Sequence, residues 1–215
     1  MPTRRLPHRG SNGSMADFAG DFLQQRLKGF KKDMEICLTG VPSMDRPGMT
    51  HAYFPALMAC CSILEYVTQL HDGKVARRSD ADIAKYANHF LPQPDYDPET
   101  CRVLVDAFRH SLAHHGIATG IWIDKNPKFN GRRITWRVHA DTRGRAIQVK
   151  PESGKLLADP PWPTPYTHRV HIHLGRLWRD IHASVMAPGG YREAVMTDPK
   201  LLRSFESCMK VLYPG

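Results

Sequence analysis

The amino-acid sequence predicts an α+β protein with an N-terminal four-helix bundle, a small antiparallel β-meander and C-terminal helices. Apolar residues recur at steps of three and four up to about residue 116, which is the spacing of amphipathic helices. After Gly120 the spacing changes to two, and clusters of Asn, Asp, Pro and Gly separate short segments, as between strands. The 215 residues are enough to bury a sizeable core.

Four helices are predicted in the first half. The first is expected to stop at Gly40 and has one apolar stripe, which contains Leu23, Leu27, Phe30, Met34 and Cys37. The second covers residues 50–71 and is apolar on nearly all sides, which is typical of a central helix. The third covers residues 79–90, with Ser79 as N-cap. The fourth begins at Asp97-Pro98, an N-cap followed by a first-turn proline, and ends near His115.

Strands are predicted in the second half at residues 121–124, 134–140, 146–150, 155–158 and 168–173. The turn between the third and fourth of these segments is expected at residues 151–154, which include a proline and a glycine. Helical spacing then resumes at Leu174, Leu177, Ile181 and Val185. A last helix is expected from Asp198-Pro199 to about Leu212.

The net charge of +9 is unevenly distributed. Residues 1–14 are predicted to be a disordered basic tail with a charge of +3, residues 15–120 have −2 and residues 121–215 have +8. We therefore expect three parts: the tail at 1–14, a helical bundle at 15–118, and a basic meander with C-terminal helices at 119–215, packed on the bundle. The last part would attract an anionic partner.

Several classes of protein are excluded by the composition. With 41% hydrophobic and 24% charged residues the chain is globular rather than disordered. No apolar run reaches the roughly 18 residues of a membrane span, and the N-terminus lacks the apolar core of a signal peptide. Five cysteines without a C-x-x-C pair argue against a disulfide framework, so reduced thiols and a cytoplasmic location are expected. No motif predicts a bound cofactor.

The end of the fourth helix contains candidate catalytic residues. At about 100° per residue, Arg109, His110 and His114 point away from the apolar stripe. A guanidinium can bind phosphate oxygens with two donors, and a neutral imidazole can transfer a proton near pH 7. These groups are therefore suited to cleaving a phosphodiester. The alternative is that they are solvated and help to end the helix, because cations favour a helix C-terminus.

The segment Arg109-His110-Ser-Leu-Ala-His114 resembles the signature of HEPN domains. These are small helical bundles in which Arg, a polar residue, three further residues and His lie near the end of a core helix. The resemblance covers roughly residues 15–118 and does not extend to the basic meander. It implies a metal-independent endoribonuclease with Arg109 and His114 catalytic, and our own expectation is that His110 assists them. It also implies a homodimer, in which the same motif of the second protomer completes the site.

A metal site is not predicted from the histidines. His110 and His114 are four residues apart, but no Glu follows His110 and a third ligand is missing. His171 and His173 share one face of a strand. Apolar residues alternate with them, as in any strand that is buried on its other face.

The basic meander contains candidate nucleic-acid-binding residues, namely Arg132, Arg133, Arg137, Arg143 and Arg145. Arginines neutralise phosphates, and the neighbouring Trp122, Trp136 and Trp162 could stack on bases. The alternative is that the tryptophans fill the core while the arginines solvate the sheet. For Trp136 the core is favoured, because it alternates with Ile134 and Val138.

Three functional hypotheses follow. The first is a HEPN-like homodimer that binds RNA and cleaves it with Arg109 and His114, while the basic second half steers the substrate. The second is a non-catalytic helical interaction module that binds a protein partner or nucleic acid. The third, a DNA-binding regulator, is disfavoured because no helix-turn-helix spacing with a basic recognition helix is found.

Overall fold

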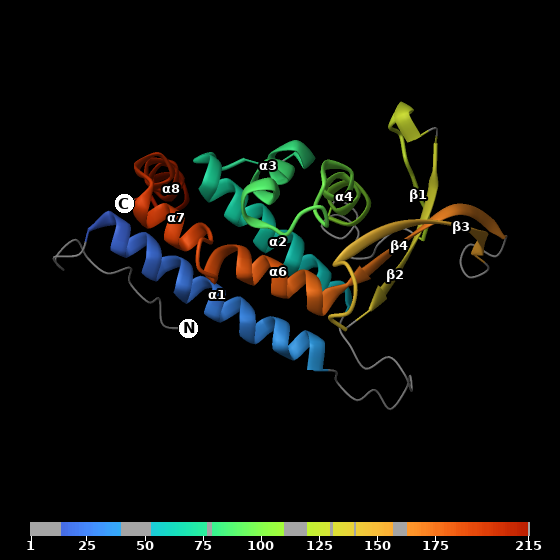
Figure 1. The fold of residues 1–215 in the computed structure, drawn as a ribbon, viewed down its shortest axis with the longest axis horizontal. Coiled ribbons are helices and arrows are strands. Elements are labelled where there is room, and N and C mark those ends of the chain that lie inside the picture. The colour runs from blue at the N-terminus through green and yellow to red at the C-terminus, as the bar shows by residue number, and fades with distance from the viewer. Residues whose placement is uncertain are drawn as a thin grey trace.

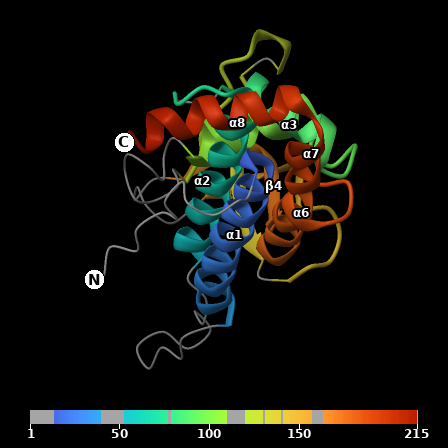
Figure 2. The same ribbon diagram turned by 90° about the vertical axis from the view of Figure 1, so that its left-hand side faces the viewer.

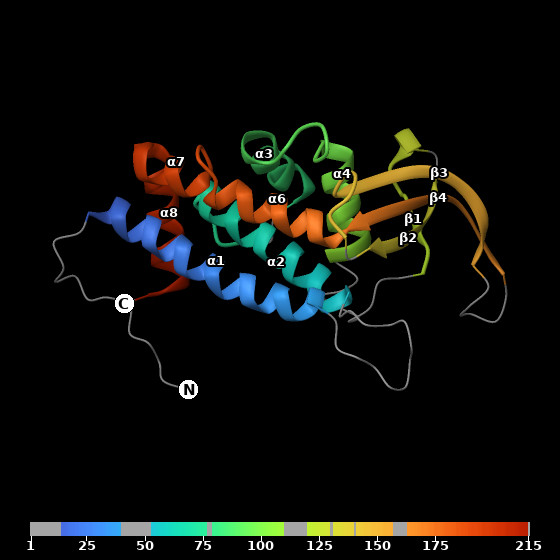
Figure 3. The same cartoon turned by 60° about the horizontal axis from the view of Figure 1, so that its bottom comes forward.

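The computed structural model places a layer of helices beside a four-stranded sheet (Figure 1). It describes residues 14–39, 53–76, 79–109, 120–129, 131–139, 141–156 and 163–214. The predicted disordered tail therefore lies almost entirely outside the described residues. Figure 3 shows the strands gathered at one end of the long helices.

The third and fourth helices begin at the residues that the sequence indicates, and the second begins at Tyr53 rather than at residue 50 in the described part of the chain. Helix α1 (Met15–Thr39) starts with a reciprocal cap, in which Ser14 and Asp17 bond to each other's backbone N–H. Helix α2 (Tyr53–Asp72) has its apolar residues buried on nearly all sides. Helix α3 (Asp80–Phe90) has Ser79 as N-cap, and α4 (Pro98–Val103) has Asp97, so both predicted caps are confirmed. Helix α4 continues as a π-helix, η1 (Leu104–Arg109).

Three helices follow the sheet in the chain: α6 (Leu174–Met186), α7 (Tyr191–Thr197) and α8 (Pro199–Leu212). Helix α8 starts where predicted, with Asp198 as its N-cap, whereas α7 was not predicted. Helices α1, α2 and α6 run side by side, and Figure 2 shows α8 crossing near their ends.

The prediction that the N-terminal helices form a bundle by themselves is wrong. Helix α1 packs against α6 and α7 as well as against α2, and α8 packs against α2. The reason is the apolar stripe of α6, since Leu174, Leu177, Ile181 and Val185 are completely buried in the same core as the first helices. The helical layer therefore contains helices from both ends of the chain.

The four strands are β1 (Trp122–Ile123), β2 (Arg133–His139), β3 (Ile147–Leu156) and β4 (Thr164–His173), in the order β1-β2-β4-β3. The β1–β2 and β3–β4 pairs are antiparallel, but β2 and β4 are parallel. The predicted antiparallel meander is therefore wrong, and the protein has a mixed sheet. Strand β4 lies between β2 and β3, which are about 10 Å apart, a distance that the chain between His139 and Ile147 can span.

The two segments predicted as separate strands at 146–150 and 155–158 belong largely to one strand, β3. The predicted turn at Pro151–Gly154 is a shift of register in that strand, with one extra residue relative to β4. A proline is tolerated there because β3 is at the edge of the sheet, where its missing N–H faces no neighbouring strand.

All five cysteines are unpaired, and Cys60 and Cys61 of α2 are buried in the core. Among the described helices, none combines the length and the apolar content needed to cross a bilayer.

Candidate functional site

The sheet has one face packed against the helices. Ile134, Ile147, Val170 and Ile172 are buried there in the common core. Trp136 packs edge-on against Phe54 of α2 with ring centroids 5.5 Å apart, so the predicted core position of this tryptophan is confirmed.

The opposite face, which we call the outer sheet face, carries polar residues in three cross-strand rows. These rows contain Thr135, Arg169 and Lys150; Arg137, His171 and Gln148; and His139 and His173. Arg137 and Lys150 are exposed, and the three histidines are partly buried. The parallel pairing of β2 with β4 brings His139 beside the two histidines of β4.

The three imidazoles form a stack on this face. The ring of His139 is 4.5 Å from that of His173 and 5.5 Å from that of His171, and both pairs are within 10° of parallel. Nε2 of His139 lies 3.2 Å from Nδ1 of His171, so these two nitrogens share one hydrogen. We refer to these three residues as the histidine stack.

Two carboxylates flank the histidine stack. Nδ1 of His173 donates to Oδ1 of Asp141 over 2.5 Å. Glu152 pairs with Arg169 at 3.0 Å, and its other oxygen is 3.8 Å from Nε2 of His171. A carboxylate that holds one ring nitrogen determines the tautomer and directs the other nitrogen away from it.

The environment lowers the pKa of His139 and of His171. In both cases burial disfavours the charged ring. Positive charge adds to this effect: Lys150 acts on His171, and the His173 ring acts on His139 when His173 is protonated. The hydrogen bond from His173 lowers the pKa of Asp141. At neutral pH we therefore expect neutral rings at His139 and His171 beside an ionised Asp141.

This arrangement predicts a specific change in titration. Replacing Lys150 with Ala removes one cation next to His171, so the pKa of His171 should rise towards the usual value of about 6.5. NMR titration of the ring Cε1–H signals measures this shift. His168, on the core face of the same strand, is the internal control, because the charges that act on it come from Arg132, Glu99 and Asp124. An equal shift at both histidines would contradict the arrangement.

Arg109 lies at the end of η1, where its guanidinium is held by Glu65 of α2. Nε donates over 2.9 Å, and Nη2 lies 2.6 and 2.7 Å from the two carboxylate oxygens. The side chain is 19% exposed. Its phosphate-binding edge is thus occupied by a carboxylate of the same chain. His110 and His114 lie outside the described residues, so their catalytic role and the homodimer that would complete it stay predictions.

The five predicted nucleic-acid-binding arginines do not share one surface. Arg132 lies in a network with the helical part, 2.7 Å from Glu99 and 2.9 Å from Asp124, and its guanidinium is 3.8 Å from the centre of the Phe129 ring. Arg145 pairs with Asp95 before α4 at 3.3 Å.

The other three arginines lie along the outer side of the sheet. Arg137 is in the same cross-strand row as His171. Arg143 is highly exposed and 3.4 Å from Asp141. Arg133, in alternation with Arg137, donates from Nε to the carbonyl of Pro165 over 2.7 Å. These arginines and the histidine stack together form the candidate site.

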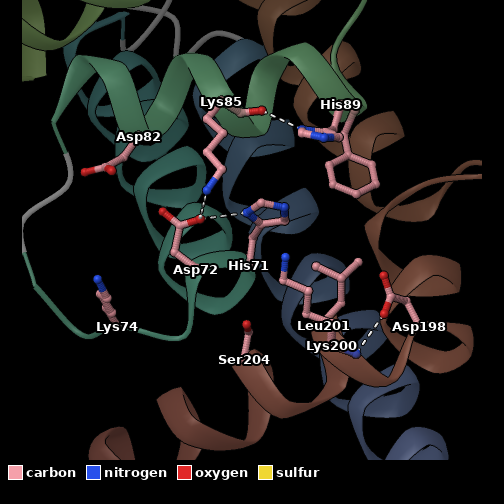
Figure 4. Close-up of a pocket in the computed structure, with 11 residues that line it drawn as sticks. His71, Asp72, Lys74, Asp82, Lys85, His89, Asp198, Lys200, Leu201 and Ser204 are labelled. Atoms are coloured by element: carbon pink, nitrogen blue, oxygen red, sulfur yellow. Dashed lines mark hydrogen bonds and ion pairs between the residues drawn. The ribbon is translucent and has the colours of Figure 1, made fainter.

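A pocket of about 400 Å³ between α2, α3 and α8 is a second feature of the surface (Figure 4). It mixes charges of both signs, from Lys74, Lys85, Lys200, Asp72, Asp82 and Asp198. Asp82 and Asp198 cap the helices α3 and α8. Asp72 accepts from Nδ1 of His71 at 2.9 Å, and burial lowers the pKa of His71. These charges balance and partly serve the helix ends, so the pocket lacks the excess of one sign that attracts a charged ligand.

Sequence reasoning did not find the histidine stack or four of the residues that form and flank it, namely His139, Asp141, Glu152 and Arg169. Alternation in the sequence already indicates that His171 and His173 share a face. The presence of a further histidine, His139, in a second predicted strand also indicated that histidines could gather on the sheet. Its position beside them depends on a parallel pairing that alternation does not specify.

In the described part of the chain, no group of three or more His, Cys, Asp or Glu side chains is arranged to hold a metal ion. Comparisons with protein-family models, with curated proteins and with solved structures found no match to this chain. The resemblance to HEPN domains therefore depends on the motif at Arg109–His114 and stays a prediction.

Proposed function

We propose that the protein binds single-stranded RNA on the outer sheet face. The observation that supports this proposal is the gathering of cations and imidazoles in adjacent cross-strand rows. Arg133, Arg137, Lys150 and Arg169 lie on this side of the sheet and Arg143 lies beside it, against the two carboxylates of Asp141 and Glu152. An excess of positive charge on one face attracts the phosphate backbone and holds it in register.

The histidine stack favours RNA in single-stranded form. Imidazole rings can stack on unpaired bases, and their nitrogens can bond to base edges and to the 2′-hydroxyl. A double helix hides these base edges from a flat sheet surface. The exposed side chains of Arg137 and Lys150 are next to the stack, so phosphates of a bound strand would lie beside the bases that contact it.

A binding measurement tests the proposal. We expect a fluorescein-labelled single-stranded RNA to bind with an affinity that falls as salt rises, followed by fluorescence anisotropy. The Arg137→Ala/Lys150→Ala double variant should bind about tenfold more weakly or worse, and the salt dependence should fall by about 0.7 in log–log slope for each phosphate that the variant no longer neutralises.

The matched control is Lys31→Ala/Lys210→Ala, which removes the same charge from exposed positions on α1 and α8. This variant should bind RNA like the unaltered protein. The proposal is wrong if the unaltered protein does not bind RNA, or if both double variants weaken binding equally. The latter result would mean that net charge, rather than the outer sheet face, attracts RNA.

A further inference from the structure

We propose that the histidine stack is an acid–base site that cleaves the bound RNA strand without a metal ion. This inference rests on the proposed function, because the RNA must first occupy the outer sheet face. It concerns residues other than Arg109 and His114. Three features of the geometry support it. One histidine is paired with a carboxylate, the other two histidines share a hydrogen, and cations lie in the neighbouring rows.

His173 is placed to act as the base. Its Nδ1–H donates to Asp141, so the lone pair of the neutral ring is at Nε2. Within the described residues, no hydrogen bond occupies this Nε2. Because the hydrogen bond lowers the pKa of Asp141, the carboxylate stays charged and can stabilise the imidazolium that forms when His173 takes a proton.

The pair formed by His139 and His171 is placed to act as the acid. Their nitrogens are 3.2 Å apart, so one ring donates to the other. An oxygen of Glu152 lies 3.8 Å from Nε2 of His171 and raises the pKa of this ring, in opposition to burial and Lys150, which lower it. A bound phosphate would add negative charge beside the pair and raise its affinity for an additional proton, which makes the pair cationic. The pair can then supply that proton to a leaving oxygen.

The cations in the neighbouring rows are placed to stabilise the reacting phosphate. Arg137 is directly across the strands from His171, and Lys150 is in the next row and raises the positive charge around the same ring. A guanidinium and an ammonium near the phosphorus favour the extra negative charge that develops on its oxygens as a nucleophile adds.

The reaction is an intramolecular transesterification of RNA. The 2′-oxygen of a ribose bonds to the adjacent phosphorus, and its proton passes to Nε2 of His173. The bond from phosphorus to the 5′-oxygen of the next nucleotide breaks, and that oxygen takes a proton from the His139–His171 pair. The products are a 2′,3′-cyclic phosphate and a 5′-hydroxyl. Exchange with water then removes the proton from His173 and returns one to the pair.

The test uses the full chain, end-labelled single-stranded RNA and EDTA. We expect cleavage products with a 2′,3′-cyclic phosphate end, and no cleavage of the same RNA with 2′-O-methyl groups. His173→Gln and His171→Gln should each lower the cleavage rate by about 100-fold or more. Binding to the uncleavable 2′-O-methyl RNA should weaken by only about tenfold or less for both variants, because the cations remain and only one ring is lost. Circular dichroism checks that the variants fold.

The matched control is His168→Gln, which changes the same residue type in the same strand on the opposite face of the sheet. It should cleave at the rate of the unaltered protein. Asp141→Asn is a second variant that keeps all three rings, and it should slow cleavage because the amide cannot stabilise the His173 imidazolium.

The outcomes separate the two proposals. If RNA binds neither in the unmodified nor in the 2′-O-methyl form, the proposed function fails. If it binds but unmodified RNA is not cleaved, or if His173→Gln and His171→Gln cleave normally, the inference of an acid–base site is wrong. Loss of cleavage in His114→Gln, with normal cleavage in both stack variants, would assign the reaction to the motif at Arg109–His114 instead.

Discussion

Replacing Asp124 with alanine is expected to lower the free energy of unfolding by about 3–5 kcal/mol. The Asp124 side chain is fully buried, and it accepts hydrogen bonds from both terminal nitrogens of Arg102, from Nη2 of Arg132 and from the Asn126 N–H, each over 2.9 Å. The side chains of Arg102 and Arg132 are only 12% and 14% exposed. Without the carboxylate, Arg102 loses its only ion-pair partner among the described residues, and this leaves a poorly solvated charge.

The contribution of Asp124 also depends on pH in a defined direction. Burial alone would raise the pKa of this carboxyl, but the hydrogen bonds from Arg102, Asn126 and Arg132 outweigh burial and lower it. The stabilisation is therefore present above the unfolded carboxyl pKa of about 3.9 and is lost as the pH falls through the folded value.

Urea unfolding of the unaltered protein and of Asp124→Ala, at pH 7 and at acid pH, measures both effects. The difference between the two proteins should be large at pH 7 and should shrink as Asp124 becomes protonated. The control is Asp21→Ala, an exposed carboxylate on α1 whose loss should cost less than about 0.5 kcal/mol. If the two substitutions have similar costs at pH 7, the Asp124 network does not stabilise the fold.

Replacing Phe205 of α8 with alanine should cost about 3–5 kcal/mol of stability. This ring is completely buried and meets Phe22 and Phe18 of α1 edge-on, with ring centroids 5.8 and 6.4 Å apart. Its removal leaves a cavity between the first and last helices of the described chain, and neighbouring helices relax only partly into such a space.

Because residues of both halves of the chain share one core, the Phe205→Ala substitution should destabilise the helices and the sheet together. Helical circular dichroism and tryptophan fluorescence should both shift to lower urea concentration by the same amount. Val211→Ala, on the same helix but 62% exposed, is the matched control and should change little. A shift confined to one of the two signals would show that the helical layer and the sheet unfold separately.

Local signals were sufficient to predict most helix starts. Ser79, Asp97 and Asp198 cap α3, α4 and α8, because a side-chain oxygen next to an apolar stripe satisfies N–H groups within the next three residues. Helix α7 was missed because its seven residues contain too few apolar positions to show a period. The prediction of a turn at residues 151–154 was wrong because Pro and Gly there mark a bulge in an edge strand.

For the candidate site residues too, the sequence predicted local features but not the contacts with distant segments. Arg109 could be placed at a helix end from its sequence, but its partner Glu65 is 44 residues earlier and no local pattern connects them. The sequence gives no reason to distinguish Arg132 from Arg137, because they lie five residues apart in the same basic segment. In the structure, Arg132 pairs with Glu99 of α4 and with Asp124 directly after β1, while Arg137 is exposed on the outer sheet face. Which arginines can meet an anion therefore depends on where acidic residues from distant segments lie.

Periodicity and capping residues in this chain were enough to establish most of its helices and strand-forming segments, because each of these depends on residues a few positions apart. The composition of each segment was enough to establish the uneven distribution of charge. The parallel pairing of β2 with β4, the common core of the first and last helices, and the histidine stack depended on contacts between distant segments. Many pairings of the same segments satisfy the local pattern equally well. The burial of apolar faces against each other, such as the stripe of α6 against α1 and α2, selects one of them.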